Sequence, residues 1–308
     1  MTAAKISIVI PVYNEEDTLE MLFARLRPVM DSLEREIEAV LVDDGSSDRS
    51  LEILKQHAGP NIKVVELTRN YGQHAAVFAG FENSDGDIVI TMDADLQNPP
   101  EEIPRLIRIM EEGDYEVVGT VRKLRKDSIF RKIPSRIVNA VTRRITGVYL
   151  NDWGCMLRAY TRPVVEHMLQ SQEHSTFIPA LATSFAKNVT EIEVSHAERI
   201  AGRSKYSFVK LMTLHFDLIT AFSDFPLQFM FYMGLFLAFF GVGFGIVLVV
   251  ARVYFGAAWA AQGVFTLFAV LFFFVGAQFL AFGVMGEYVG RIYREVKKRP
   301  AYTIRKVY

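Results

Sequence analysis

Cysteine is nearly absent from this sequence. Cys155 is the only cysteine among 308 residues, so no disulfide can form within the chain, and a reducing cytosolic compartment is compatible with it. The N-terminal residues lead almost directly into an apolar strand, so we expect no signal peptide. The net charge is -1, but the charges are unevenly distributed along the chain, so the net value indicates no class of partner. We expect no nucleic-acid ligand.

Charged residues are missing from two long stretches in the C-terminal third. Residues 225–251 and 253–286 contain no Asp, Glu, Lys or Arg, and only Arg252 separates them. Each stretch exceeds the roughly 20 residues with which a helix crosses a bilayer. The sequence therefore predicts two membrane spans, at about 227–251 and 264–288.

The basic residues predict the orientation of these spans. The connecting loop contains only Arg252, whereas the second span is followed by Arg291, Arg294, Lys297, Lys298 and Arg299. By the positive-inside rule the tail is cytoplasmic and the loop is outside. We therefore expect a multi-pass membrane protein with both termini in the cytoplasm. Its expected parts are a soluble domain at 1–224, two spans within 225–290 and a basic tail at 291–308.

Apolar strands and amphipathic helices alternate through the soluble domain. This alternation predicts an α/β fold with a mostly parallel sheet and right-handed crossovers. The first helix is expected from Glu15 to Leu33, bent or shortened by Pro28. The expected strands are residues 5–11, 38–42, 63–67, 87–90, 115–119 and 192–194.

Two aspartates stand where the fourth of these strands ends, at the edge where open α/β sheets bind ligands. Asp93, Asp95 and the amide of Gln97 offer only oxygen ligands, which suit Mg²⁺ or Mn²⁺ carrying a diphosphate. Asn98 and the two prolines after it suit a helix start. The simpler alternative is a pair of exposed turn aspartates beside a helix cap. The loop alone does not decide between the two readings.

A strongly basic segment follows the fifth strand. Residues 122–144 contain nine Lys or Arg and one acid, Asp127, and apolar residues recur every four positions from Ile129 to Ile145. This pattern is typical of an interfacial membrane helix, expected at about 128–147. An ordinary amphipathic helix packed on the sheet is the alternative. A second amphipathic segment is expected at 207–222.

Three motifs together resemble one enzyme family. They are Ile8–Glu15 (IVIPVYNE), Val42–Ser46 (VDDGS) and Asp93–Gln97 (DADLQ). The combination is similar to the nucleotide-sugar domain of glycosyltransferase family 2, whose members have a GT-A fold and invert the anomeric centre. The two C-terminal spans narrow the resemblance to polyprenyl-phosphate glycosyltransferases. Further similar segments extend it over nearly the whole chain.

The resemblance implies a reaction and a location. It implies transfer of a sugar from a UDP-sugar donor to undecaprenyl phosphate at the cytoplasmic face of the bacterial inner membrane. The implied sugar is 4-deoxy-4-formamido-L-arabinose, destined for lipid A, while glucosyl or mannosyl transfer by the same architecture stays open. Related enzymes also suggest a homo-oligomer embedded in membrane lipid, with a tetramer as one arrangement.

Two other classes fit the sequence less well. Processive polysaccharide synthases of this fold carry a Gln-x-x-Arg-Trp motif, whereas neither Trp153 nor Trp259 follows an Arg. A non-catalytic membrane scaffold would be expected to lose the paired carboxylates, and both are present. An enzyme is therefore favoured.

Candidate roles follow for individual residues. The expected metal ligands are Asp95 and Gln97, with Asp93 alongside. The resemblance surrounds the nucleotide with Pro11, Tyr13, Glu15, Asp44 and Asp93, while Asp43 supports the turn. The candidates for catalysis are Asp152, Arg122 and Arg199, with a helix cap as the alternative for Asp152. The candidates for binding the acceptor phosphate or the diphosphate are Arg131, Arg203, Ser204 and Lys205, with membrane-surface charges as the alternative. His74 has no second ligand at helical spacing, so a zinc role is disfavoured.

Overall fold

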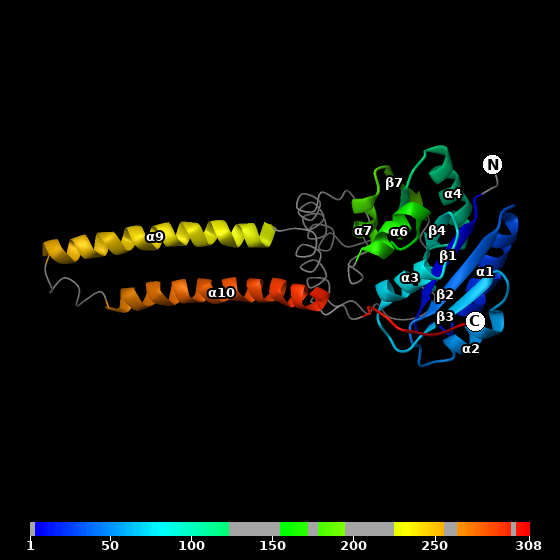
Figure 1. Cartoon of the computed structure of the whole chain (residues 1–308), viewed down its shortest axis with the longest axis horizontal. Helices are drawn as coiled ribbons and strands as arrows, with labels where there is room; N and C mark the ends of the chain where they lie inside the picture. Colours follow the sequence, from blue (N-terminus) through cyan, green and yellow to red (C-terminus); the bar gives the residue numbers. More distant parts are fainter. Residues whose placement is uncertain (1–3, 123–154, 172–177, 195–224, 256–263, 297–299) are drawn as a thin grey trace. The chain divides into compact units, whose positions relative to one another are not determined.

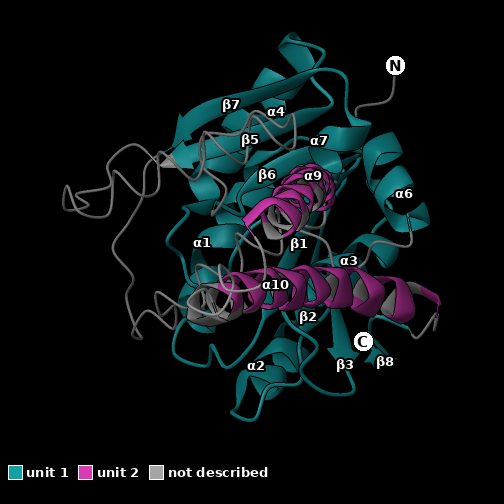
Figure 2. Ribbon diagram, turned by 90° about the vertical axis from the view of Figure 1, so that its left-hand side faces the viewer, with its two compact units in different colours: residues 1–212, 300–308 teal, residues 213–299 magenta. Residues whose placement is uncertain are grey.

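The computed structural model describes residues 4–122, 155–171, 178–194, 225–255, 264–296 and 300–308 (Figure 1). Contacts between residues divide the chain into two compact units (Figure 2). Residues 1–212 and 300–308 form the first, and residues 213–299 form the second. The interfacial helices expected at 128–147 and 207–222 lie outside the described residues.

Eight strands form one sheet in the first unit, in the order β7-β5-β6-β4-β1-β2-β3-β8. β1 pairs in parallel with both β2 and β4, β2 with β3, and β5 with β7. The predicted α/β fold with a mostly parallel sheet is therefore confirmed. The strands are β1 (Ile6–Val12), β2 (Ile37–Asp43), β3 (Ile62–Leu67), β4 (Ile88–Thr91), β5 (Val117–Arg122), β6 (Arg158–Thr161), β7 (Val189–Val194) and β8 (Ile304–Val307).

Two strands that the sequence did not predict run antiparallel to their neighbours. β6 lies between β4 and β5, with Ala159 opposite both Ile90 and Val118. β8 pairs with β3 at the edge of the sheet, with Ile304 opposite Leu67. Residues 300–308, expected within a basic tail, therefore add a strand to the first unit.

Helices cover both faces of the sheet, and strand side chains alternate between two cores. Ile8 and Ile10 of β1 join the core beneath one set of helices, whereas Val9 joins the core beneath the other. The first set is α1 (Leu19–Ser32), α2 (Ser50–His57) and α4 (Ile103–Glu112), and the second is α3 (Gln73–Glu82), α6 (Arg162–Gln170) and α7 (Ile178–Phe185). α1 begins later than expected and continues through Pro28 to Ser32.

The described residues of the second unit form two long helices, α9 (Phe225–Phe255) and α10 (Val264–Val296), at the positions of the two predicted spans. Within the described residues, Phe273–Gly290 of α10 is long and apolar enough to cross a membrane, and Leu227–Gly241 of α9 is a shorter apolar stretch. Many of the large apolar side chains on both helices are exposed, among them Phe236 and Phe279.

Candidate active site

The carboxyl ends of β4, β1 and β2 lie side by side at one edge of the sheet. The chain passes from β1 to β2 on one side of β1 and returns as β4 on the other. In doubly wound folds such a change of direction opens a crevice outside the strand ends. Asp44 N–H donates to Val12 O at 2.8 Å, which extends the pairing of β1 and β2 past the last residue of β2. The loops that carry Tyr13, Asp44 and Asp93 therefore leave the sheet at a common edge.

Hydrogen bonds to its two aspartates help to hold the acidic loop, residues 92–98 after β4. Asp93 is half-buried, and its Oδ1 accepts a hydrogen bond from Gln73 Nε2 at 2.6 Å. Asp95 is buried, and its Oδ1 accepts the backbone N–H of Gln97 at 3.1 Å. Leu96, between Asp95 and Gln97, is fully buried. Its φ of 58° is a left-handed conformation that a branched side chain rarely adopts. Strained backbone of this kind is concentrated in functional loops.

The acidic loop is the candidate metal site. Among the described residues, no group of three or more His, Cys, Asp and Glu side chains could hold a metal ion by itself. Asp93, Asp95 and Gln97 still bring three side-chain oxygen donors to one loop, and these suit Mg²⁺ or Mn²⁺. Mg²⁺ usually keeps several waters and takes further ligands from substrate phosphates. The loop therefore fits an ion that arrives with a nucleotide diphosphate.

Asn98 does not open the following helix, so this part of the sequence prediction is wrong. The helical turn η1 (Pro100–Glu102) has Pro99 as its N-cap residue and no side-chain cap. Asn98 is buried, and its Oδ1 accepts a hydrogen bond from Cys155 Sγ at 3.4 Å. Its side chain thus ties the acidic loop to the segment before β6 and leaves the helix start to the prolines.

The two aspartates at the end of β2 have different partners. Asp43 Oδ2 accepts the backbone N–H of Ser46 at 3.2 Å, which confirms its predicted support of the turn. Asp43 Oδ1 is buried and has no hydrogen-bond partner among the residues that the structure describes. Asp44 is also buried, and it accepts the backbone N–H groups of Tyr71 at 2.7 Å and Gly72 at 2.9 Å. Burial raises the pKa of both carboxyl groups, and these hydrogen bonds oppose the rise.

The segment from Arg69 to Gln73, which we call the donor loop, links both acidic strand ends. Its backbone N–H groups bind Asp44, and the Gln73 side chain binds Asp93. Gly45 allows the close approach: its φ is +68°, and a Cβ there would lie 2.4 Å from the carbonyl carbon of Arg69. The sequence predicted no role for this loop, because the backbone N–H groups of Tyr71 and Gly72 are common to every residue type except proline.

The loop after β1 presents one exposed candidate. Tyr13 is 39% exposed. Asn14 has a φ of 54°, and its Oδ1 accepts the backbone N–H of Ser47 at 2.8 Å. Glu15 is half-buried, and its Oε2 accepts a hydrogen bond from Thr18 Oγ1 at 3.1 Å. Pro11 lies on β1, one residue before the strand ends.

Most of the candidates for catalysis and for phosphate binding lie outside the described residues. These are Arg131, Asp152, Arg199, Arg203, Ser204 and Lys205. Arg122 is the last residue of β5 and pairs with Val194 of β7, and its side chain is not among those described. Burial lowers the pKa of His74 to about 4, which makes it a neutral imidazole at pH 7.

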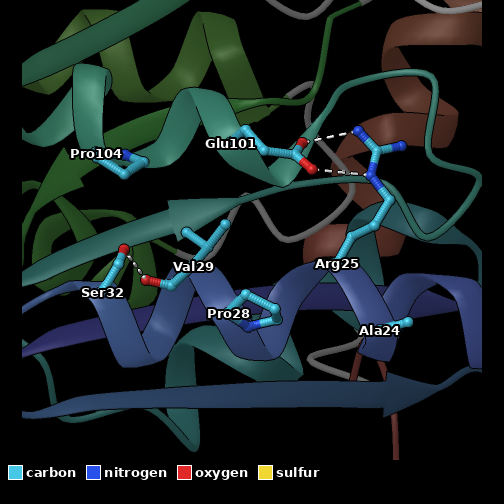
Figure 3. Close-up of a pocket in the computed structure, with 7 residues that line it drawn as sticks. All are labelled: Ala24, Arg25, Pro28, Val29, Ser32, Glu101 and Pro104. Atoms are coloured by element: carbon cyan, nitrogen blue, oxygen red, sulfur yellow. Dashed lines mark hydrogen bonds and ion pairs between the residues drawn. The ribbon is translucent and has the colours of Figure 1, made fainter.

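A groove on the surface lies between α1 and the segment that follows the acidic loop (Figure 3). Arg25 donates two hydrogen bonds to Glu101, at 3.0 and 2.7 Å, across this groove. No candidate site residue lines it. The two hydrogen bonds across the groove anchor Glu101, four residues beyond Gln97, to α1.

A doubly wound sheet with an acidic loop at its switch point is an arrangement in which α/β proteins bind ligands. The chain belongs to glycosyl transferase family 2, whose family model matches residues 7–168. It is 54% identical over 306 residues to a Photorhabdus laumondii protein named undecaprenyl-phosphate 4-deoxy-4-formamido-L-arabinose transferase, covering 98% of this chain and 94% of the relative. A Proteus mirabilis protein of the same name is equally similar, with 54% identity over the same shares of both chains.

Solved structures share the fold of the first unit. Glucosyl-3-phosphoglycerate synthase from Mycobacterium tuberculosis, in complex with Mn²⁺, UDP-glucose and phosphoglyceric acid, superposes with a TM-score of 0.50 and 20% identity. The match covers 70% of this chain and 78% of that one. A second mycobacterial protein gives a TM-score of 0.53 at 21% identity, covering 70% of this chain and 73% of that one. These likenesses support the GT-A fold.

Proposed function

We propose that this protein transfers 4-deoxy-4-formamido-L-arabinose from UDP to undecaprenyl phosphate. The observation that carries the proposal is 54% identity over 98% of the chain to relatives named for this activity. The product would supply the sugar with which lipid A is modified. Glucosyl or mannosyl transfer to the same lipid is the alternative that donor screening decides.

The acidic loop supports a metal-assisted departure of UDP. Asp95 and Gln97, with Asp93 alongside, are the residues that would hold Mg²⁺ or Mn²⁺. A divalent ion stabilises the negative charge that grows on the β-phosphate as it leaves. The mycobacterial structural neighbour is named as a complex with Mn²⁺ and UDP-glucose, which supports a divalent metal in general.

The strand ends support a nucleotide pocket. Tyr13 is the exposed aromatic residue there, Asp44 orders the donor loop, and Pro11 and Glu15 shape the turn after β1. The uracil and ribose would lie against these residues, with Asp93 next to the ribose or the diphosphate.

The acceptor needs little activation, because a phosphate monoester with a second pKa near about 6 is largely dianionic at neutral pH. A single in-line displacement then inverts the anomeric carbon. Asp152 would orient the reactants or act as a weak base. Arginine suits phosphate oxygens, so Arg122 and Arg199 would neutralise the phosphates of the donor or the acceptor. The acceptor phosphate or the diphosphate would bind Arg131, Arg203, Ser204 and Lys205.

The two helices of the second unit support a membrane location. We expect α9 and α10 to cross the bacterial inner membrane, with residues 256–263 outside and the catalytic domain and both termini in the cytoplasm. Labelling of Trp259→Cys by an impermeant maleimide in intact spheroplasts tests this orientation. Background should be low because Cys155 is buried. Labelling only after membrane disruption would reverse the predicted topology.

Glycines on these helices support self-association. A Cβ on Gly241 would lie 3.6 Å from the Phe274 ring, so Gly241 serves the contact between α9 and α10. A Cβ on Gly234, Gly243 or Gly283 would meet nothing within 4 Å. Such positions allow close approach of a second copy, so a homo-oligomer such as a tetramer is expected. Crosslinking in membranes that yields only monomer would count against it.

The reaction is tested with purified protein, undecaprenyl phosphate and Mn²⁺, by measuring UDP release from UDP-4-deoxy-4-formamido-L-arabinose. UDP-glucose and GDP-mannose serve as competing donors. Asp95→Ala should lose nearly all activity, whereas Asp17→Ala, on an exposed position, should retain it. Wild-type release no faster than that of Asp95→Ala would refute the enzyme, and faster release from another donor would reassign the sugar.

A further inference from the structure

The C-terminal segment makes an extended contact with the catalytic sheet. β8 pairs with β3, and Tyr308 and Val64 exchange both backbone hydrogen bonds, at 2.9 and 3.1 Å. Side chains reinforce the pairing at Glu66, which is 5% exposed and accepts from Tyr308 Oη at 2.7 Å and Arg305 Nη1 at 2.9 Å. Lys55 Nζ lies 3.4 Å from the same carboxylate. The register of β8 shifts between Glu66 and Leu67, and the contacts of the buried Glu66 with Tyr308 and Arg305 hold the strand in place there.

The start of this segment reaches the donor loop. Thr68 N–H donates to Thr303 O at 3.0 Å, and Arg305 Nη2 donates to Thr68 O at 3.3 Å. Thr68 Oγ1 is 2.8 Å from Tyr71 Oη in turn. Both backbone groups of Thr68, the residue before the donor loop, are therefore held by the C-terminal segment.

Tyr302 adds a second attachment, to the helix that follows the donor loop. Its Oη donates to Glu82 Oε2 at 2.8 Å at the end of α3, and its ring packs against the core that lies beneath this helix. Tyr71 packs against the same core. The C-terminal segment thus braces the donor loop at its start through Thr68 and beyond its end through α3.

The same loop carries the donors that bind both acidic strand ends. Tyr71 and Gly72 donate to Asp44, and Gln73 donates to Asp93. A displacement of the loop would remove three hydrogen bonds from two carboxylates of the candidate site. Hydrogen bonding by Thr303, followed by that of Thr68, lowers the pKa of the Tyr71 phenol to about 8, which agrees with contact between the two segments.

We propose that Tyr302 and Thr303 are positioning residues of the donor site, acting through the donor loop on Asp44 and Asp93. The inference rests on the proposed function, because it assigns UDP to these strand ends. It gives the segment that follows α10 a role in donor affinity although none of its residues would touch the donor.

Two substitutions in the full-length protein test the inference. Thr303→Val removes the hydroxyl that bonds to Tyr71 and keeps the branched shape and the backbone oxygen that accepts from Thr68. Tyr302→Phe removes the donor to Glu82. Each should weaken Mn²⁺-dependent UDP binding, measured by calorimetry, about three- to tenfold. Thr303→Ser should restore wild-type affinity. The KM for undecaprenyl phosphate should not change.

Lys306→Ala is the matched control, because its exposed side chain lies on the same strand and contacts Tyr308, not the donor loop. Hydrogen exchange gives a second readout that needs no ligand: the amides of Tyr71 and Gly72 should exchange faster in Thr303→Val than in Lys306→Ala. Variants whose UDP affinity equals that of the control would overturn this inference and leave the proposed function standing. An unchanged rate of hydrogen exchange at the Tyr71 and Gly72 amides would do the same. A wild-type protein without affinity for UDP would overturn the proposed function and this inference with it.

Discussion

Gln73 Nε2 lies 2.6 Å from Asp93 Oδ1 and ties the first residue of α3 to the loop after β4. The bond orients one carboxylate oxygen of the acidic loop toward the neighbouring loop and leaves the rest of the group to other partners. A neutral donor does this without adding a charge that would compete with a metal ion. The acidic loop therefore depends on a side chain that is twenty residues away in the sequence.

The first prediction concerns this bond. Gln73→Leu removes the donor while keeping a side chain of similar size, so Asp93 should lose its orientation. We expect the KM for the UDP-sugar to rise about three- to tenfold with a smaller change in kcat. Gln56→Leu, the same substitution on an exposed position of α2, is the control. Steady-state kinetics that are equal for the two variants would contradict the role of Gln73.

A second prediction concerns Asp44. Asp44→Asn keeps one acceptor oxygen, but its NH₂ group must face the backbone N–H of Tyr71 or Gly72. A buried donor left without its acceptor costs about 1–3 kcal/mol, so the thermal midpoint should fall by about 2–10 °C. UDP affinity should fall with it. Asp17→Asn, at an exposed position between β1 and α1, should leave both quantities unchanged.

A third prediction uses three glycines to distinguish the cost of a strained backbone from the cost of a steric contact. A Cβ at Gly59 meets nothing within 4 Å and needs no unusual φ, Gly72 has a φ of +97° with open space, and Gly45 combines a φ of +68° with a contact at 2.4 Å. Alanine should therefore be nearly neutral at Gly59, cost about 1–2 kcal/mol at Gly72, and cost more at Gly45. Chemical denaturation of the three variants should give this order. An equal cost at Gly72 and Gly45 would mean that the donor loop moves freely.

The loss of stability at acid pH should depend in part on the protonation of His74. Its pKa in the folded chain is lowered by burial to about 4, against 6.5 for an ordinary histidine. The unfolded chain binds more protons between these values, so this contribution to stability is complete above pH 6.5 and is lost as the pH falls toward 4. His74→Gln should flatten the fall of the thermal midpoint over this window. A slope equal to that of the wild type would show that His74 is protonated in the folded protein.

Much of the sheet could be predicted because the signals are local. β1, β2, β3 and β4 are short apolar runs followed by polar loops, and their ends place Tyr13, Asp44 and Asp93 without any knowledge of contacts. The acidic loop was found for the same reason. The chemistry of the acidic loop is carried by its side chains, which can be read directly from the sequence.

β6 and β8 could not be predicted, because pairing at a distance decides them. β6 contains Arg158, which is fully buried although arginine normally indicates an exposed position. β8 reads as part of a basic tail, and its partner strand lies far earlier in the chain: Glu66 and Tyr308 are 242 residues apart. The donor loop was missed for a related reason. Two of its three hydrogen bonds to Asp44 and Asp93 come from backbone N–H groups, which every residue type except proline supplies.

The position of β8 in the chain also has a consequence for biosynthesis. The ribosome makes this strand only after α9 and α10, so β3 remains an open edge throughout most of translation. Unpaired edges recruit foreign strands, and contacts between distant segments form slowly. A product truncated within either apolar helix would therefore expose the β3 edge permanently and leave the donor loop without its brace. Completion of the sheet thus reports that both helices have been synthesised, which gives quality control a simple criterion for an intact chain.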